Sequence, residues 1–258
     1  MPVFKFKQFE VEQDRCAQKI GTDAVLLGAW MEAEDPKTVL DVGTGTGVIA
    51  LMAAQRFPLA QIEAVELDEQ AFEQATDNFE NSPWNDRLFC FHASFQEFCA
   101  EMEEPYDLIV SNPPFFDSQM LNENHEPETR RKQARFDDSL SFEDLIGGVK
   151  YLLADEGTFT CIIPKAREQQ MIEIALEHGM TVSRISDVKG RADVPSKRSL
   201  IAFRNDPNSV PKQNGLNNEV SIPDRSLLII EKSRHNYTEE YKNLTRDFYL
   251  DKGTETEK

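Results

Sequence analysis

The sequence is poor in cysteine and has no long apolar run. Its four cysteines, Cys16, Cys90, Cys99 and Cys161, are scattered without a CxxC pair. This spacing argues against a disulfide framework or a zinc site and favours free thiols in a reducing cytosol. No apolar run approaches the roughly 20 residues that a membrane helix needs. The opening stretch MPVFKFKQFE alternates apolar and polar residues, unlike a signal peptide. We therefore expect a cytoplasmic protein that binds neither a membrane nor a metal ion.

Positive charge is also scarce, with 28 Lys and Arg residues against 46 Asp and Glu residues and a net charge of −18. Taken alone, this balance argues against a nucleic-acid binder. An acidic protein can bind RNA only where its cations gather locally. Two such clusters are present, and we expect both to contact RNA: Arg130, Arg131, Lys132 and Arg135 in the first, and Lys189, Arg191, Lys197 and Arg198 in the second. A third cluster, with Lys232 and Arg234, is expected to be solvated surface.

Short β-rich runs alternate with helical patterns along most of the chain. Strands are predicted at 38–42, 61–67, 87–92, 106–111, 157–164, 181–188 and 197–204. Helical patterns follow most of them, which predicts an α/β fold with a mostly parallel, seven-stranded sheet and helices on both faces. No helix separates the last two strands, so we expect these two to pair antiparallel.

The chain length suits a single domain. Residues 1–37 precede the core sheet at 38–204. Within that core, the polar, aperiodic stretch 117–137 predicts a loop. Residues 205–224, rich in Asn and Pro, predict a linker, and residues 225–258 then supply a further strand and a helix over 237–250.

The stretch DVGTGTG, residues 41–47, ends the first predicted strand and opens the first helix. Glycines at such a turn let a ligand approach the backbone closely. Gly43, Gly45 and Gly47 are spaced GxGxG, and Val48 stands where the dinucleotide fingerprint has its third glycine, which disfavours NAD. Glu66 ends the next strand, where a carboxylate can accept both hydroxyls of a ribose. Together these features favour a ligand that contains adenosine.

The stretch SNPPFF, residues 111–116, ends the fourth predicted strand. Pro113 and Pro114 fix their backbone angles and lack N–H donors, so the turn is stiff. Asn112 adds a side-chain carbonyl, and two fixed acceptors suit a planar –NH2 group. Phe115 can stack on the flat ring system that carries the amine. In parallel sheets the ends of the first and fourth strands are neighbours, so this turn should lie beside the glycine loop.

GTGTG together with NPPF resembles the class I S-adenosylmethionine-dependent methyltransferases that modify planar amines, whose fold is Rossmann-like. Three further blocks, 4–30, 81–88 and 237–250, are similar to the bacterial tRNA methyltransferase family that modifies adenosine 37 of valine tRNA at its exocyclic N6 amine. The resemblance covers almost the whole chain and implies a monomeric enzyme that uses S-adenosylmethionine and binds the anticodon loop.

The resemblance also implies roles for individual residues. The three glycines would pack under the methionine part of the cofactor with Asp41 beside them, while Glu66 would hold its ribose. Residues 1–37 would help to cover the cofactor, through Thr22 and Asp23 in particular. Many relatives have an aspartate that reaches the adenine amine where this chain has Ser94. The target amine would be received by Asn112 and the Pro113 carbonyl in the NPPF turn, with Pro114 stiffening the turn and Phe115 stacking on the base.

Three other readings remain open. A glutamine methylase of release factors and a guanine-amine methylase of ribosomal RNA act on the same kind of planar amine. Release-factor enzymes usually carry a helical domain before the glycine loop, where this sequence has only 37 residues. A non-catalytic protein could also keep the fold as a binding scaffold, although the presence of Gly45, Glu66 and Asn112 counts against it.

Overall fold

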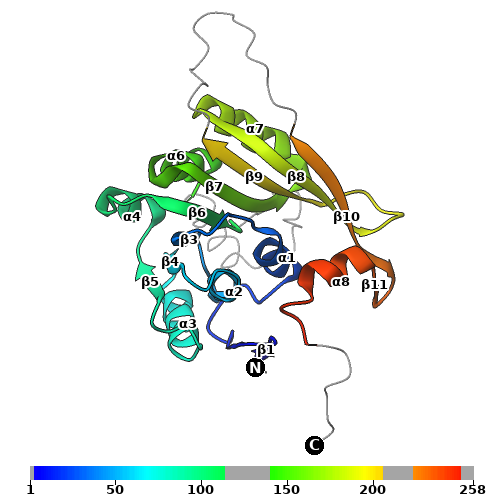
Figure 1. Ribbon diagram of the computed structural model, residues 1–258, viewed down its shortest axis with the longest axis horizontal. Helices are drawn as coiled ribbons and strands as arrows, with labels where there is room; N and C mark the ends of the chain where they lie inside the picture. Colours follow the sequence, from blue (N-terminus) through cyan, green and yellow to red (C-terminus); the bar gives the residue numbers. More distant parts are fainter. Residues whose placement is uncertain (1–2, 114–139, 206–222, 251–258) are drawn as a thin grey trace, which may run out of the picture.

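The computed structural model describes residues 3–113, 140–205 and 223–250. Its centre is a nine-stranded sheet with the order β11-β10-β8-β9-β7-β6-β3-β4-β5 (Figure 1). The strands of this sheet are β3 (Thr38–Val42), β4 (Gln61–Glu66), β5 (Leu88–His92), β6 (Tyr106–Ser111), β7 (Leu153–Pro164), β8 (Met180–Arg191), β9 (Arg198–Asn205), β10 (Asp224–Ser233) and β11 (Asn236–Tyr237). A separate hairpin near the N-terminus pairs β1 (Phe4–Lys5) with β2 (Glu10–Val11).

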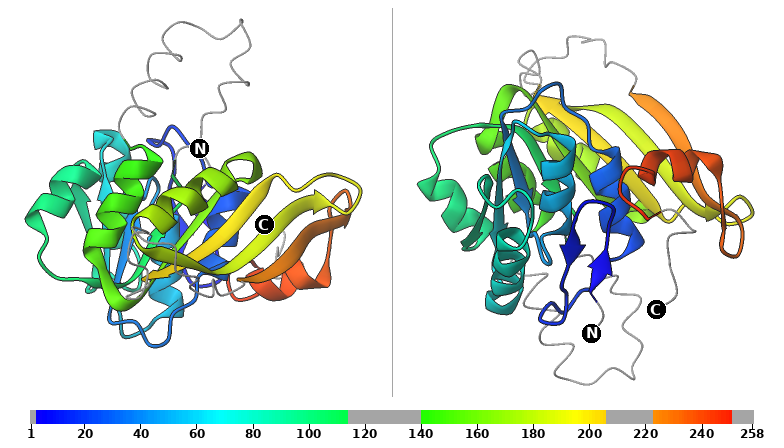
Figure 2. Two further views of the ribbon diagram at one scale, coloured as in Figure 1. Left: turned by 90° about the horizontal axis from the view of Figure 1, so that it is seen from above. Right: turned by 60° about the horizontal axis from the view of Figure 1, so that its bottom comes forward.

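Helices cover both faces of the sheet, as Figure 2 shows. One apolar cluster lies under α1 (Thr22–Trp30), α2 (Val48–Arg56), α3 (Glu69–Glu80) and α8 (Glu239–Thr245). The cluster on the opposite face lies under α4 (Phe95–Glu101), α6 (Phe142–Leu152) and α7 (Glu168–Glu177), which follows the short 3-10 helix η1 (Lys165–Arg167). The central strands β3 and β6 are buried almost throughout because both of their faces are covered.

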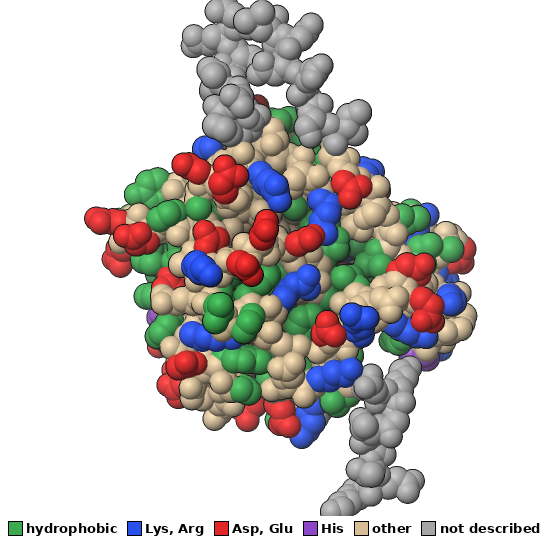
Figure 3. Space-filling model, in the orientation of Figure 1, with side chains coloured by type: hydrophobic (Ala, Val, Ile, Leu, Met, Phe, Trp, Pro, Cys, Tyr) green, Lys and Arg blue, Asp and Glu red, His purple; other side chains and the backbone are tan. Residues whose placement is uncertain are grey.

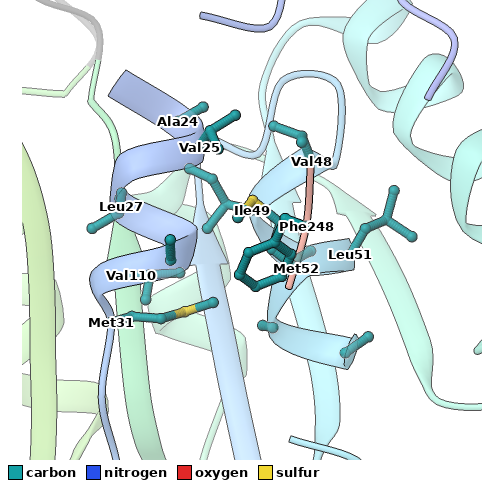
Figure 4. Packing of buried hydrophobic residues seen from close by; sticks show 14 of the residues in the cluster. Ala24, Val25, Leu27, Met31, Val48, Ile49, Leu51, Met52, Val110 and Phe248 are labelled. Atoms are coloured by element: carbon teal, nitrogen blue, oxygen red, sulfur yellow. The ribbon is translucent and has the colours of Figure 1, made fainter. Parts of the chain in front are cut away.

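The first apolar cluster joins segments that are far apart in the sequence. Figure 4 shows side chains of α1 and α2 packed together, with Phe248 from the C-terminal segment against them. Gly28 lets the two helices approach closely, since an added Cβ would lie 2.5 Å from the sulfur of Met52. The C-terminus of α1 is fixed by Arg184, whose guanidinium lies 3.8 Å from the centre of the Trp30 ring and donates to the Trp30 carbonyl.

The direction of the strands brings many carboxyl ends to one edge. Strands β5, β4, β3, β6 and β7 are parallel; β9 is antiparallel to β7, and β8 is antiparallel to β9. Strand β10 is parallel to β8. All of these strands except β9 therefore end at the same edge of the sheet, which we call the carboxyl edge. Ligands bind at this edge in open α/β sheets.

The predicted fold class is confirmed, including the antiparallel pairing of the last two predicted strands, β8 and β9. The strand count differs: the described residues form nine strands in this sheet. The residues that form β10 hydrogen-bond to the outer side of β8, which would otherwise be a long unpaired edge. The predicted helix over 237–250 is shorter, because Tyr237 pairs within β11 and α8 ends at Thr245. None of the helices in the described ranges is long and apolar enough to cross a membrane.

Candidate active site

The glycine loop leaves β3 with three left-handed residues. Gly43, Gly45 and Gly47 have φ of +73°, +57° and +79°, a region that L-residues with a side chain rarely adopt. A Cβ added at Gly43 or Gly45 would meet nothing within 4 Å, so open space lies against these two positions. A Cβ at Gly47 would lie 2.5 Å from the Phe79 ring. The first two glycines thus open toward a ligand site, whereas Gly47 makes room for packing between the loop and α3.

Glu66 ends β4 and holds the glycine loop from the other side. Glu66 is buried, with 8% of its surface exposed to solvent. Oε2 accepts a hydrogen bond from the Gly45 N–H at 2.8 Å, and Oε1 accepts one from the Asp68 N–H at 2.9 Å. Burial raises the pKa of Glu66, although these backbone donors oppose the rise. The Leu67 N–H is a further backbone donor to this carboxylate. Since the two oxygens together offer four acceptor positions, Glu66 retains acceptor capacity for a ligand.

Asp41 lies beneath the same loop and is fully buried. Its Oδ2 accepts a hydrogen bond from the Thr44 hydroxyl at 2.6 Å, which ties the loop to β3. Burial raises the pKa of Asp41 to about 7, because an ionised carboxylate loses its hydration there. This side chain does not line the cavity described next, so its place indicates support of the loop.

A cavity of about 180 Å³ opens above the glycine loop at the carboxyl edge. Its walls come from the ends of β3, β4, β5 and β6 and from residues 16–18 before α1. Five residues with a predicted site role line this cavity: Gly43, Gly45, Glu66 and Ser94 as cofactor contacts, and Asn112 in the NPPF turn. The wall combines open glycine backbone, a carboxylate at a strand end and apolar side chains such as Val65 and Phe95. Such a lining suits an adenosine-containing ligand with a charged amino-acid tail.

Residues 16–18, which form part of the wall, belong to the segment 1–37 that was predicted to cover the cofactor, but they were not named individually. Cys16, Ala17 and Gln18 line the cavity, although no motif marks them. Two buried side chains of α3 hold the segment that leads to them: the Arg15 N–H donates to Gln74 Oε1, and Asn78 exchanges hydrogen bonds with the Glu12 backbone. Burial raises the pKa of the Cys16 thiol to about 11, so this thiol is neutral near pH 7.

Ser94 lies in the cavity wall as the N-cap of α4. Its hydroxyl oxygen accepts from the Glu97 N–H at 3.2 Å, and its own backbone N–H donates to Glu97 Oε2 at 3.0 Å, which together form a capping box. The Ser94 hydroxyl also donates to Glu97 Oε2 at 2.7 Å. The hydroxyl proton is therefore engaged, and one acceptor position of the oxygen is used. Contact between Ser94 and an adenine amine stays a prediction.

Thr22 and Asp23, at the start of α1, are not among the residues that line this cavity. Asp23 instead pairs with Arg198 at 2.7 Å, one of the cations predicted to bind RNA. Thr22 lines a second cavity, together with Arg191 and Lys197. Lys189 lies on β8, between Val188 and the turn that leads to β9. The predicted roles of these residues stay predictions.

Asn112 and Pro113 follow β6 at the side of the cavity. The Ser111 hydroxyl donates to the Val42 carbonyl at 2.9 Å, which fixes the end of β6 against the start of the glycine loop. Asn112 is partly exposed and lines the cavity, while Pro113 is buried. Several predicted site residues lie outside the described residues, namely Pro114, Phe115, Arg130, Arg131, Lys132 and Arg135.

No group of three or more His, Cys, Asp or Glu side chains that could hold a metal ion occurs within residues 3–113, 140–205 and 223–250. The arrangement that is present consists of a glycine loop, the Glu66 carboxylate at a strand end and the Asn112 amide around one cavity. These groups can hold a cofactor and orient a polar substrate beside it.

Comparison with known proteins defines the class. A family profile described as methyltransferase small domain matches residues 16–128. A predicted O-methyltransferase from Agrobacterium tumefaciens superposes with a TM-score of 0.64 at 16% identity, covering 88% of this chain and 96% of that one. Precorrin-6y C5,15-methyltransferase from Geobacter metallireducens gives a TM-score of 0.50 at 17% identity, covering 74% and 93% of the two chains. The protein has the methyltransferase fold, and it is a methyltransferase.

Curated relatives define the family. A protein named tRNA1(Val) (adenine(37)-N6)-methyltransferase from Christiangramia forsetii is 50% identical over 96% of this chain and 97% of its own length. Proteins of the same name are 47% identical in Flavobacterium psychrophilum, over 96% and 99% of the two chains, and 39% identical in Proteus mirabilis, over 96% and 93%. The chain belongs to the family of tRNA1(Val) (adenine(37)-N6)-methyltransferases.

Proposed function

We propose that this protein transfers a methyl group from S-adenosylmethionine to the N6 amine of adenosine 37 in valine tRNA. The observation that carries this proposal is the position of Asn112, which lines the same cavity as Gly43, Gly45 and Glu66. Strands β6 and β4 flank β3 on either side, so the amide acceptor and the ribose acceptor face each other across the glycine loop.

The cavity residues fit the cofactor part by part. The open faces of Gly43 and Gly45 admit its amino-acid chain, and the remaining acceptor capacity of Glu66 suits its ribose hydroxyls. Ala93 and Phe95 offer apolar surface for its adenine. When bound, S-adenosylmethionine supplies an electrophilic methyl group on a sulfonium centre.

Asn112 and Pro113 would orient the target. The amide oxygen of Asn112 and the carbonyl of Pro113 each accept one hydrogen of the adenine amine. This holds the amine lone pair out of the ring plane, where it is available as a nucleophile. The nitrogen becomes cationic during the reaction, and fixed carbonyl dipoles stabilise that charge. The proton that the amine then loses is acidic enough to pass to water, so no dedicated base is required.

The substrate follows from the family. Glutamine and guanine carry the same planar amine and could enter a similar turn, so the Asn112 geometry does not by itself choose between them. Relatives that match over nearly their whole length carry the adenosine 37 name. An anticodon-loop base is partly unstacked already, which lowers the energy needed to bring it into a pocket.

The direct test incubates the purified protein with methyl-labelled S-adenosylmethionine and unmodified valine tRNA transcript. We expect N6-methyladenosine at position 37, identified by mass spectrometry of digested RNA. The matched control is the same transcript with guanosine at position 37, which should stay unlabelled. Label on that guanosine transcript, or on a release factor but not on RNA, would contradict the proposal.

A further inference from the structure

A second, larger cavity of about 1,240 Å³ opens at the same edge of the sheet. Its walls are the β1–β2 hairpin, the turn between β8 and β9, the β10–β11 turn and α8, and we call it the α8 groove. Thr22, the first residue of α1, also lines it. Figure 2 shows the hairpin and α8 on the same side of the molecule.

The α8 groove is basic in a protein whose net charge is −18. Six of its lining residues are cationic, whereas Glu231 is its one acidic lining residue: the six are Lys5, Arg191, Lys197, Arg234, Lys242 and Arg246. Over much of the face shown in Figure 3, Lys and Arg side chains stand among many Asp and Glu side chains. A local excess of this kind is what an acidic protein needs in order to bind a polyanion.

Most of these cations also have a carboxylate nearby. Lys5, Arg191, Lys242 and Arg246 each lie 2.7–3.5 Å from an exposed acid on a neighbouring part of the chain. Such exposed pairs are weak and exchange readily with other anions. Lys197 and Arg234 form no ion pair with any side chain in the described ranges, so these two charges are the least neutralised of the set.

Aromatic rings line the same groove. The Tyr237 and Tyr241 rings stack with their centres 5.0 Å apart, and Tyr249 continues the row at 6.5 Å from Tyr241. Phe4 of the hairpin lies 6.4 Å from Tyr249. Tyr241 is 6% exposed and forms the floor, whereas Tyr237 and Tyr249 are partly exposed at the wall. Cations beside partly exposed rings are the usual composition of a single-strand RNA surface.

The carboxyl edge connects the α8 groove to the cavity. The cavity lies at the ends of β3 to β6, and the groove lies at the ends of β8 and β10. Strands β8 and β10 stand three and four places from β6, so at about 4.8 Å per strand the groove begins roughly 15–19 Å from Asn112. An RNA strand whose base enters beside Asn112 can therefore reach the groove within a few nucleotides.

We propose that the α8 groove binds the unpaired strand of the tRNA anticodon loop that flanks the target adenosine. Lys197 and Arg234 contact its phosphates, and the partly exposed ring of Tyr237 stacks on a base. This proposal rests on the proposed function, because it takes the substrate to be an anticodon loop. It also assigns a role to Arg234, which the sequence placed on the solvated surface.

Three variants test the groove with the unmodified anticodon stem-loop of valine tRNA as the probe. K197A/R234A removes the two unpaired cations, and Y237L removes a ring while keeping apolar volume. The matched control is K37A/R204A, which removes two exposed cations from the opposite edge of the sheet, where β3 begins and β9 ends. Affinity is measured by fluorescence anisotropy between 50 and 200 mM salt.

We expect K197A/R234A to lower the slope of log K against log salt by about 1–2 units, because each lost phosphate contact removes about one unit. We expect Y237L to weaken binding about 5- to 150-fold with the slope unchanged, since it removes stacking and no charge. The groove variants should raise the KM for tRNA while leaving kcat and the Kd for S-adenosylhomocysteine at wild-type values. The control should match the wild type throughout.

The outcomes separate this proposal from the proposed function. If both groove variants bind and methylate the RNA like the wild type and melt at the same temperature, the groove is not the binding surface. If affinity depends on the groove but adenosine 37 is never methylated, the groove stands and the proposed function is wrong. A wild-type protein that neither binds nor methylates this RNA overturns both.

Discussion

Replacing Glu66 by alanine tests the cofactor side of the cavity. The carboxylate accepts hydrogen bonds from the N–H groups of Gly45 and Asp68 and keeps acceptor capacity for a ligand. Removing it leaves the ribose hydroxyls of a bound cofactor without their partner, a loss of about 1–3 kcal/mol. The Kd for S-adenosylhomocysteine should therefore rise about 5- to 150-fold. The two backbone bonds are lost as well, so the variant should also unfold at lower urea concentration.

The assay is isothermal titration calorimetry with S-adenosylhomocysteine, alongside urea unfolding of the same samples. E69A is the matched control, because Glu69 is an exposed acid three residues further along at the start of α3. Its Kd should equal that of the wild type. An E66A protein that is folded at the assay temperature and binds with wild-type Kd would refute the assignment of Glu66 to the ribose.

Three further predictions concern neighbouring positions. N112A should lower the rate of single-turnover methyl transfer to tRNA about 10²-fold or more, because it removes one preorganised acceptor of the amine. It should change the cofactor Kd far less than E66A does. Turnover close to that of the wild type would mean that the NPPF turn has only a structural role. D41N removes a carboxyl group whose pKa is about 7 in the folded protein, above its ordinary value. The protonated Asp41 therefore contributes its full stability to the wild type below about pH 4, and this contribution is lost as pH rises through about 7. The unfolding free energy of D41N relative to wild type should accordingly rise by up to about 4 kcal/mol between pH 4 and pH 8 in urea titrations, and a pH-independent difference would contradict it. G47A should destabilise the fold by about 2–4 kcal/mol in the same titrations, since φ is +79° and the new Cβ meets Phe79.

Local patterns predicted the core of the sheet well. Each strand from β3 to β5 is a short run of apolar residues followed by a turn and a helical pattern, and periodicity alone identifies such units. The N-cap of α3 also depends on local sequence, since Asp68 directly before the helix accepts a hydrogen bond from the Ala71 N–H. The glycine loop and Glu66 could be predicted because each lies at the end of a predicted strand, so a short stretch of sequence identifies its position.

What the sequence could not predict depends on contacts between distant segments. A strand was expected at 225–232, but no local sequence pattern indicated that it would extend the sheet by pairing with β8. The aromatic stripe in 237–250 was read as one helix, whereas Tyr237 and Phe248 reach the apolar cluster from either side of α8. Residues 16–18 enter the cavity wall only because Gln74 and Asn78, some 60 residues later, hold the chain that leads there.

Ser94 shows how two patterns can compete for one residue. Its place after the third strand pointed to a cofactor contact, yet Ser94 and Glu97 also match the S-x-x-E signature of a capping box. The structure makes that box, so the hydroxyl is partly committed to starting α4. The family resemblance implied the cofactor contact, which stays a prediction, and the capping box is what the structure adds.

The most direct test compares valine tRNA from a strain that lacks this protein with tRNA from its parent, by mass spectrometry of the nucleosides at position 37. We expect N6-methyladenosine in the parent and unmodified adenosine in the deletion strain. A plasmid carrying the wild-type gene should restore the modification, whereas one carrying N112A should not. Modification that persists without the protein, or that N112A restores in full, would contradict the assignment of the reaction to the cavity beside Asn112.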